Sequence, residues 1–172
     1  MGMTQATKTC LSKYFTFSGR ASRSEFWWFA LFVILALAVL AVIDALIFGS
    51  DLQTKKANTV LSGLFQVAMF VPLLAAGWRR LHDSGKPGWY ILLPMLVSVI
   101  FLIGLLSGVV TFGLIEGQVV DPDALRGPAA ILGVTGMAVF GVVQIVLAVL
   151  MIWWLTRPSD AGDNAYGPQP LS

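Results

Sequence analysis

The chain has 172 residues, of which 57% are hydrophobic and 12% are charged, and its mean hydropathy is +0.81. Soluble domains have a charged fraction of about 25%, so this composition excludes an ordinary soluble domain. The formal net charge of +2 gives no basis for binding nucleic acid. We therefore expect a membrane protein, and the absence of a long polar stretch predicts a single membrane domain over residues 1–172.

Four apolar runs are long enough to cross a bilayer, because about 20 residues rising 1.5 Å each span about 30 Å of hydrocarbon. In chain order they are residues 26–48, 60–78, 89–115 and 129–155. All four are apolar on every side and lack the alternation of barrel strands, so they are predicted to be helices. The predicted fold class is all-α, an integral membrane bundle of four transmembrane helices with a tail at 156–172.

The segment before the first run has three features of its own. Ser22 and Glu25 have the spacing of a capping box, in which the serine accepts a helix amide and the glutamate turns back to the serine amide. Residues 8–17 mix lysines with apolar side chains and predict a short interfacial segment. Cys10 is alone, which predicts a reduced thiol without a disulfide.

Basic residues separate the two sides of the predicted bundle. Eight lie on one side: Lys8, Lys13, Arg20, Arg23, Arg79, Arg80, Lys86 and Arg157. Three lie on the other side: Lys55, Lys56 and Arg126. The positive-inside rule therefore places both termini and the segment between the second and third runs in the cytoplasm. All six tryptophans also fall at the predicted cytoplasmic helix ends, either as headgroup anchors or as walls of a pocket shared with the cations.

Polar residues inside the predicted helices are few. Asp44 is within about one turn of a helix end, which favours a solvated interface position over a proton relay. Gln66 and Gln144 are expected to form hydrogen bonds between helices, and Gly104 with Gly108 has the spacing of a close packing face. A coupled transporter would need more polar groups than these.

The segment at 79–89 is the densest cluster of charge, and its place between two apolar runs predicts a surface loop. Its cations can hold a phosphate group: Arg79, Arg80 and Lys86. His82 titrates near neutral pH, and Asp83 can orient it or pair with another cation. The alternative is an ordinary basic cytoplasmic loop with a solvated histidine. One histidine and one cysteine, far apart in the chain, predict no metal site.

The tail is rich in turn residues, and composition alone predicts disorder. The alternative is that the tail folds back, with Asp163 paired to one of four arginines. These are Arg20, Arg23, Arg79 and Arg80. Such a pair would join three separate cytoplasmic segments into one polar cap.

Three segments give the chain a resemblance to a known family. They are Ser-Gly-Arg-Ala-Ser-Arg-Ser-Glu-Phe-Trp-Trp at 18–28, Arg-Arg-Leu-His-Asp-Ser-Gly-Lys-Pro-Gly-Trp at 79–89 and Gly-Asp-Asn-Ala-Tyr-Gly-Pro at 162–168. In this order they resemble the signatures of a bacterial inner-membrane family catalogued as domain of unknown function 805. Pro87 and Tyr90 depart from the pattern around the turn. The resemblance implies a multi-pass protein of the bacterial inner membrane and brings no established activity.

We therefore expect a noncatalytic inner-membrane protein whose basic and aromatic cytoplasmic cap binds anionic lipid headgroups or a protein partner, with no metal, cofactor or catalytic residue. The expected binding residues are Arg20, Arg23, Arg79, Arg80, His82, Asp83, Lys86, Trp89 and Asp163. The expected partners are membrane lipids, a second copy of the chain or another membrane protein, and no nucleic acid. One alternative is a small transporter or channel subunit. Another is an enzyme acting on a phosphorylated lipid, with His82 as acid or base.

Overall fold

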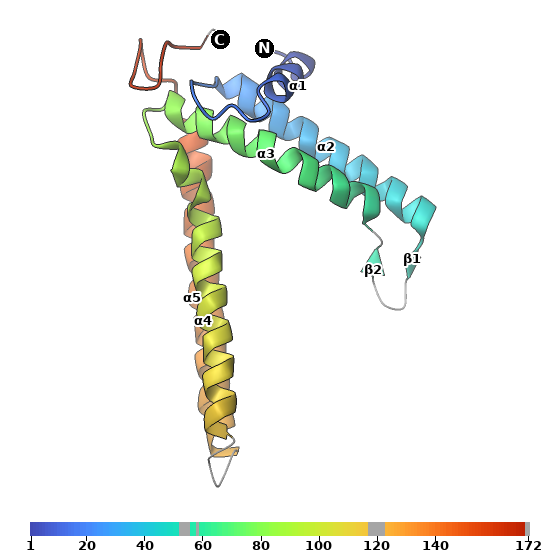
Figure 1. Cartoon of the computed structure of the whole chain (residues 1–172), viewed down its shortest axis with the longest axis vertical. Helices are drawn as coiled ribbons and strands as arrows, with labels where there is room; N and C mark the ends of the chain where they lie inside the picture. The colour runs from blue at the N-terminus through green and yellow to red at the C-terminus, as the bar shows by residue number, and fades with distance from the viewer. Residues whose placement is uncertain (52–55, 58, 117–122, 171–172) are drawn as a thin grey trace. The chain divides into compact units, whose positions relative to one another are not determined.

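The computed structural model describes residues 1–51, 56–57, 59–116 and 123–170, and the side chains of 1–49, 59–108 and 133–170. Its elements are α1 (Met3–Ser12), α2 (Arg23–Phe48), β1 (Ser50–Asp51), β2 (Lys56–Ala57), α3 (Val60–Asp83), the 3₁₀ turn η1 (Gly88–Leu92), α4 (Leu93–Glu116) and α5 (Asp123–Thr156) (Figure 1). The two short strands pair antiparallel, with Ser50 opposite Ala57. The all-α prediction is confirmed.

Four helical segments in the described part of the chain are long and apolar enough to cross a membrane: Arg23–Phe48, Val60–Asp83, Gly88–Gly108 and Gly133–Thr156. Large apolar side chains on them are exposed in the isolated chain, among them Leu46, Val67 and Ile100. Apolar exposure on this scale is expected where lipid, and not water, surrounds the helices. The four predicted membrane-spanning helices are therefore confirmed.

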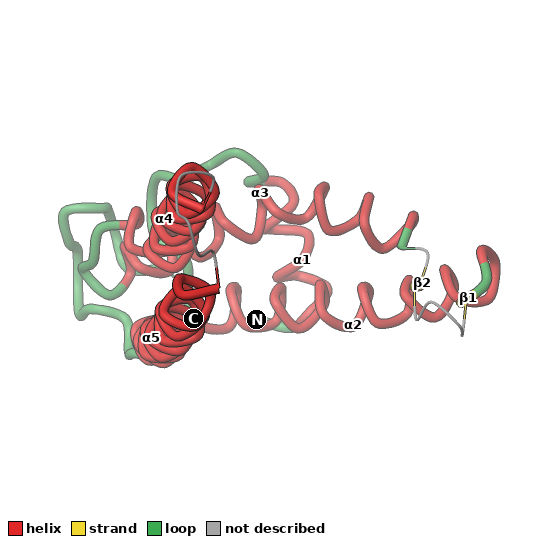
Figure 2. Tube along the Cα trace, turned by 90° about the horizontal axis from the view of Figure 1, so that it is seen from below, coloured by secondary structure: helices red, strands yellow, loops and turns green. Residues whose placement is uncertain are grey.

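The chain forms two compact units, the first made of residues 1–91 and 154–172 and the second of residues 92–153. The single membrane domain expected over residues 1–172 stays a prediction. In the first unit α2 and α3 lie side by side, and α1 packs across α2 (Figures 1 and 2). Their core contains Cys10, Phe26, Phe29, Val33, Ala76, Leu81 and Leu155. Of the segment expected at 8–17, residues 8–12 are the end of α1, which begins at Met3, and residues 13–15 form a turn.

Asp44 holds the start of α3. Its two carboxylate oxygens accept the backbone amides of Leu61 at 2.8 Å and Ser62 at 2.9 Å, and the Ser62 hydroxyl at 2.6 Å. These first-turn amides have no partner inside their own helix, so a carboxylate from α2 serves as the cap. The expected solvated position is wrong, because Asp44 is only 1% exposed.

The start of α2 follows half of the predicted capping box. The Ser22 hydroxyl accepts the Glu25 amide at 3.2 Å, as expected. The Glu25 carboxylate does not return to Ser22. It lies instead 3.3 Å from a guanidinium nitrogen of Arg79, which offers a full positive charge where the serine amide offers only a dipole.

The second unit consists of α4 and most of α5, which lie side by side (Figures 1 and 2). The Gln144 side-chain amide donates to the Pro94 carbonyl at 3.1 Å and to the Ser98 hydroxyl at 2.6 Å, which confirms its predicted interhelical role. The same role is wrong for Gln66, which is exposed and forms no hydrogen bond with the described residues. A methyl group built at Gly104 would meet no neighbour, so this glycine marks no close packing face within the chain.

Candidate functional site

The segment predicted as a surface loop begins as helix. α3 continues five residues beyond the end of its apolar run, and residues 79–83 form its last turns. Arg79 and Arg80 are 1% and 0% exposed, and Asp83 is 0% exposed. The predicted loop is wrong for these five residues because charged partners inside the protein replace the water that we expected around them.

Three arginines and two carboxylates form a buried arginine cluster: Arg20, Arg79, Arg80, Glu25 and Asp83. Asp83 is its centre. One of its carboxylate oxygens accepts the Arg20 Nε at 2.9 Å, and the other contacts both Arg80 Nη1 and the Ser159 hydroxyl. Its main-chain carbonyl accepts the Asp160 amide at 2.9 Å. Asp83 therefore pairs with cations, which was one of its two expected roles, and joins the segment before α2, the end of α3 and the tail.

Arg20 ties the tail down through main-chain carbonyls. Its Nη1 donates to Gly162 at 2.7 Å and to Gly167 at 3.3 Å, and its Nη2 donates to Asp160 at 2.8 Å. The following residue, Ala21, donates its amide to the Arg79 carbonyl at 3.1 Å. The three segments that resemble family signatures thus meet at one place, although they are far apart in the sequence.

Arg80 connects the cluster to the end of α5. Its Nε donates to the Leu155 carbonyl at 3.0 Å, and its Nη2 donates to the Arg157 carbonyl. The last carbonyls of a helix have no partner within the helix and form the negative end of its dipole. A buried guanidinium there satisfies the carbonyls while Asp83 balances its charge.

Arg79 has a different environment, deeper between α1 and α2. Its Nε donates to the Ala75 carbonyl at 3.3 Å, while its two terminal nitrogens are buried without a hydrogen-bond acceptor. The nearest opposite charge is Glu25, which also contacts the Cys10 sulfur at 3.8 Å. Burial, reinforced by the negative charge of Glu25, raises the pKa of the Cys10 thiol to about 12. Cys10 is therefore an unreactive buried thiol.

His82 packs against the tail. Its ring stacks on the Tyr166 ring at a centroid distance of 3.8 Å, and its Nδ1 lies 3.1 Å from the Gly19 carbonyl. The Asn164 side chain donates to the His82 carbonyl at 2.9 Å. The residue is only 7% exposed, so His82 is not the solvated histidine of an ordinary loop.

The turn after α3 depends on two glycines. Gly85 has a φ of +68°, and a β-carbon there would collide with the Asp160 carboxylate. A β-carbon at Gly88 would fall on the Trp78 ring. Lys86 lies over the Trp154 ring, 5.1 Å from its centroid, which is a cation–π distance. At both glycines the backbone therefore lies directly against a neighbouring side chain, Asp160 at Gly85 and Trp78 at Gly88.

The predicted Asp163 ion pair is wrong. The tail does fold back, but Asp163 is exposed and forms no ion pair with the described residues. Arg20 is already satisfied by Asp83 and by tail carbonyls, so it has no need of a second carboxylate. The acid that joins the segments is Asp83, which lies next to the arginines in sequence.

The remaining site residues are more accessible. Arg23 is exposed and borders a pocket of about 380 Å³ that is also lined by Ser22, Ser24 and Ser159. Trp89 is 47% exposed, and Trp27 and Trp28 are similarly exposed, as headgroup anchors would be. Trp78 and Trp154 are half-buried. The Trp78 ring lies edge-on to His82 with centroids 6.4 Å apart, and the Trp154 ring lies beneath Lys86.

Sequence reasoning missed the contribution of Cys10, Glu25 and Tyr166. Glu25 was assigned to the capping box, and nothing local to Tyr166 indicates a histidine partner 84 positions away. Only the resemblance of the 162–168 segment to a family signature singled out that part of the tail.

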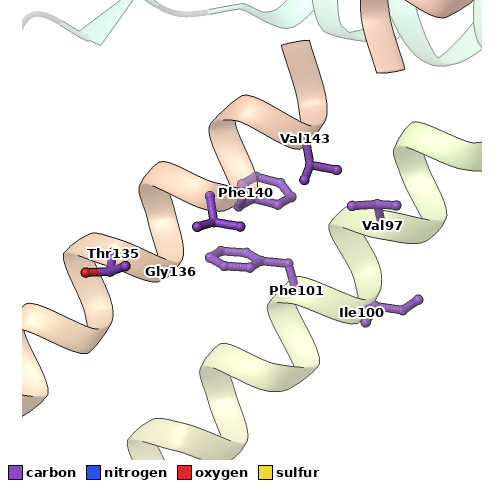
Figure 3. A pocket seen from close by; sticks show the side chains of 8 residues that line it. Val97, Ile100, Phe101, Thr135, Gly136, Phe140 and Val143 are labelled. Atoms are coloured by element: carbon purple, nitrogen blue, oxygen red, sulfur yellow. The ribbon is translucent and has the colours of Figure 1, made fainter. Parts of the chain in front are cut away.

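A second cavity, of about 550 Å³, lies between α4 and α5 (Figure 3). Phe101 and Phe140 stack across it with centroids 4.1 Å apart, and Val97 and Val143 extend the apolar wall. Thr135 is the one polar side chain among its lining residues. Such a groove suits hydrocarbon and has no group that would orient a polar ligand, so we do not assign the site there.

No cluster of metal ligands occurs within the described residues. Comparison with protein families gives a match over residues 14–122 to the model described as "Protein of unknown function (DUF805)". The chain belongs to the DUF805 family. The match includes the arginines of the cluster and both carboxylates, while the tail lies beyond it.

Two similar proteins of Escherichia coli (strain K12) support the DUF805 membership. "Inner membrane protein YhaH" is 32% identical over 93 residues, which cover 54% of this chain and 74% of that protein. "Inner membrane protein YhaI" is 42% identical over 83 residues, covering 48% of this chain and 64% of that protein. No solved structure matches the chain. Together with the four membrane-spanning helices, these matches identify this DUF805 chain as a multi-pass inner-membrane protein.

Proposed function

We propose that this DUF805 protein is a noncatalytic inner-membrane protein that binds anionic lipid headgroups on a cationic surface beside the arginine cluster. The cluster consists of Arg20, Arg79, Arg80, Glu25 and Asp83, so three guanidinium groups face two carboxylates. The excess positive charge is buried, where water screens it weakly.

The observation that supports this proposal best is the pocket beside Arg23. Its wall contains the hydroxyls of Ser22, Ser24 and Ser159, and it opens at the first turn of α2, where unpaired helix amides favour an anion. The first 24 residues contain four basic and no acidic side chains, and the acid nearest to Arg23 in sequence, Glu25, is paired with Arg79. The Ser159 hydroxyl already donates to Asp83, and the Ser22 and Ser24 hydroxyls lie 3.1 Å apart, so the Arg23 guanidinium is the main donor that a phosphate group would meet there.

The binding residues expected from sequence divide into two groups under this proposal. Arg20, Arg79, Arg80, His82 and Asp83 are buried in internal contacts, so they supply charge and rigidity and do not touch the ligand. The exposed cation Arg23 makes the contact. Lys86, Trp89 and Asp163 border the same end of the unit, and their roles in binding stay predictions.

The other two candidate functions gain little from the structure. The polar groups that a transport path would use, Asp44 and Gln144, are engaged in a helix cap and an interhelical bond. His82, the expected acid or base of a lipid enzyme, is stacked beneath Tyr166 and 7% exposed.

Native mass spectrometry of the purified full-length chain tests headgroup binding, with phosphatidylglycerol and phosphatidylcholine as probes. Arg23→Gln should lower phosphatidylglycerol retention about fivefold, since one basic residue near an anionic surface contributes about 1 kcal/mol. Lys56→Gln removes the same charge from the opposite end of α2–α3 and should have no effect. Equal retention of the two lipids by the wild type, or no loss in Arg23→Gln, contradicts the proposal. Loss of a copurifying protein instead of the lipid supports the protein-partner alternative.

The proposal places both termini and the end of α3 in the cytoplasm, as the basic residues predict. In a Cys10→Ser background, Ser84→Cys should react with an impermeant maleimide only after the cells are opened. Thr54→Cys should react in intact cells. The reverse pattern would show that the orientation is inverted, and the surface would then face the periplasm.

A further inference from the structure

We infer that the groove between α1 and α2 is a seat for one whole anionic phospholipid, with the phosphate at Lys8 and an acyl chain along Phe32. This inference rests on the proposed affinity for anionic headgroups and assigns a second site, separate from the pocket at Arg23. The groove has a volume of about 600 Å³ and is formed by one face of α1 together with Phe32 of α2.

The lining residues of α1 form a single stripe. Met3, Thr4, Thr7, Lys8 and Leu11 recur at helical spacing, while Ala6 and Cys10, on the other side of the helix, are fully buried against the core. α1 is therefore held in place by one face and offers the other to the groove. A groove with one wall fixed in this way keeps its shape without a ligand.

Lys8 is the charged group of the groove. It is exposed, and no carboxylate of the described residues forms an ion pair with it. The Thr7 hydroxyl donates to the Met3 carbonyl at 2.9 Å and the Ser12 hydroxyl to the Thr9 carbonyl at 2.9 Å. These hydroxyl protons are already in use, so the Lys8 ammonium is the donor that an anion would meet, with Thr4 beside it.

The depth of the groove argues for a lipid and against a soluble phosphate. Trp27 and Trp28 are exposed near the start of α2, at the position where tryptophans lie among headgroups. Phe32 is one turn further along α2, about 6 Å deeper at 1.5 Å per residue, and so reaches the acyl region. Cys10, two residues after Lys8, contacts Glu25 in the first turn of α2, so this part of α1 lies level with the start of α2. The groove therefore runs from a cation near headgroup level to an aromatic ring in the hydrocarbon, which matches a molecule with an anionic head and an apolar chain.

Native mass spectrometry of the full-length chain, titrated with phosphatidylglycerol, phosphatidylcholine or inorganic phosphate, tests the seat. Lys8→Gln should lower phosphatidylglycerol retention about fivefold. Lys13→Gln removes the same charge five residues away, outside the groove, and should leave retention unchanged. Thr4→Trp keeps the charge but fills the groove, and it should lower retention as well. Inorganic phosphate alone should not compete.

Three results would overturn the seat. If Lys8→Gln and Lys13→Gln lose equal affinity, binding is general attraction to a basic segment. If neither variant loses affinity while Arg23→Gln does, the lipid binds at the other pocket and the proposed function stands. Competition by inorganic phosphate would mean that the groove takes an anion without its chain. Wild type that retains phosphatidylglycerol no better than phosphatidylcholine contradicts the proposed function itself.

Discussion

Each end of α3 lies beside a buried aspartate, Asp44 of α2 at the start and its own Asp83 at the end, and the charges of the two aspartates are balanced in opposite ways. At the start of the helix, Asp44 is satisfied by two backbone amides and a hydroxyl, with no cation needed. At the other end, Asp83 lies among carbonyls at the negative end of the helix dipole and is balanced by Arg20 and Arg80. The end of α3 that a carboxylate faces therefore decides whether backbone amides balance its charge or arginines do.

Removing the charge of Asp83 should have the larger effect. Asp83→Asn leaves Arg20 and Arg80 buried without a counter-charge, and breaking a buried pair in this way costs about 3–5 kcal/mol. The free energy of unfolding in detergent measures the loss. Asp163→Asn is the matched control, because this exposed residue should change stability by less than about 0.5 kcal/mol. If both variants lower the free energy of unfolding equally, the buried ion pairs of Asp83 contribute no more to stability than an exposed surface carboxylate.

Asp44→Asn should lower the free energy of unfolding by less, about 1–2 kcal/mol. This is the usual cost of losing a helix cap whose hydrogen bonds are strengthened by the charge of a carboxylate. The loss should be local, so amide exchange should rise at Leu61 and Ser62 while the end of α3 is unchanged. Ser62→Ala is the control, since it removes one hydroxyl contact and leaves both amide contacts in place. A loss as large as that of Asp83→Asn would contradict the difference between the two ends.

Burial of the Cys10 thiol, reinforced by the negative charge of Glu25, makes the stability of the chain depend on pH. The folded thiol has a pKa of about 12, against an ordinary value of 9.0. The unfolded chain therefore loses this proton first, so the contribution is complete below pH 9 and is lost as the pH rises toward 12. Stability should fall by up to about 1.4 kcal/mol per pH unit in this window. Cys10→Ala should remove that slope, and an unchanged slope would assign it to other groups.

The smallest predicted effect concerns the tail. Tyr166→Ala removes the ring stacked on His82, a contact that contributes about 1 kcal/mol, and should speed cleavage before the exposed Asp163 by the protease Asp-N about fivefold. Tyr166→Phe keeps the ring and should be cleaved like the wild type. If both variants are cleaved at the wild-type rate, the stacking does not hold the tail.

The membrane helices could be predicted because an apolar run long enough to cross the bilayer satisfies its backbone hydrogen bonds in lipid by forming a helix. α2 and α3 start within a few residues of the predicted positions. The end of α3 was missed because Arg79 and Arg80 were assumed to need water. A helix can continue through charged residues when carboxylates and carbonyls from other segments surround them, and those partners are up to 77 positions away.

The sequence predicted which residues belong to the candidate site but not which groups they contact. Arg20, Arg80 and Asp83 were all singled out from sequence, yet as accessible binding groups. Burial depends on the tail folding over them, and the tail's composition is that of a loose terminus. The tail is held in part by main-chain carbonyls of Asp160 and Gly162, which any residue provides, so the residue types in the tail do not predict these hydrogen bonds.

Hydrogen–deuterium exchange of the full-length chain in nanodiscs tests the central claim, that a buried charge cluster holds the tail against α2 and α3. In the wild type, amides of residues 159–167 should be protected. Asp83→Asn should remove that protection and the protection of residues 19–22, while the Gln144 region of α5 stays unchanged. A tail that exchanges freely in the wild type, or one equally protected in Asp83→Asn, would contradict the claim.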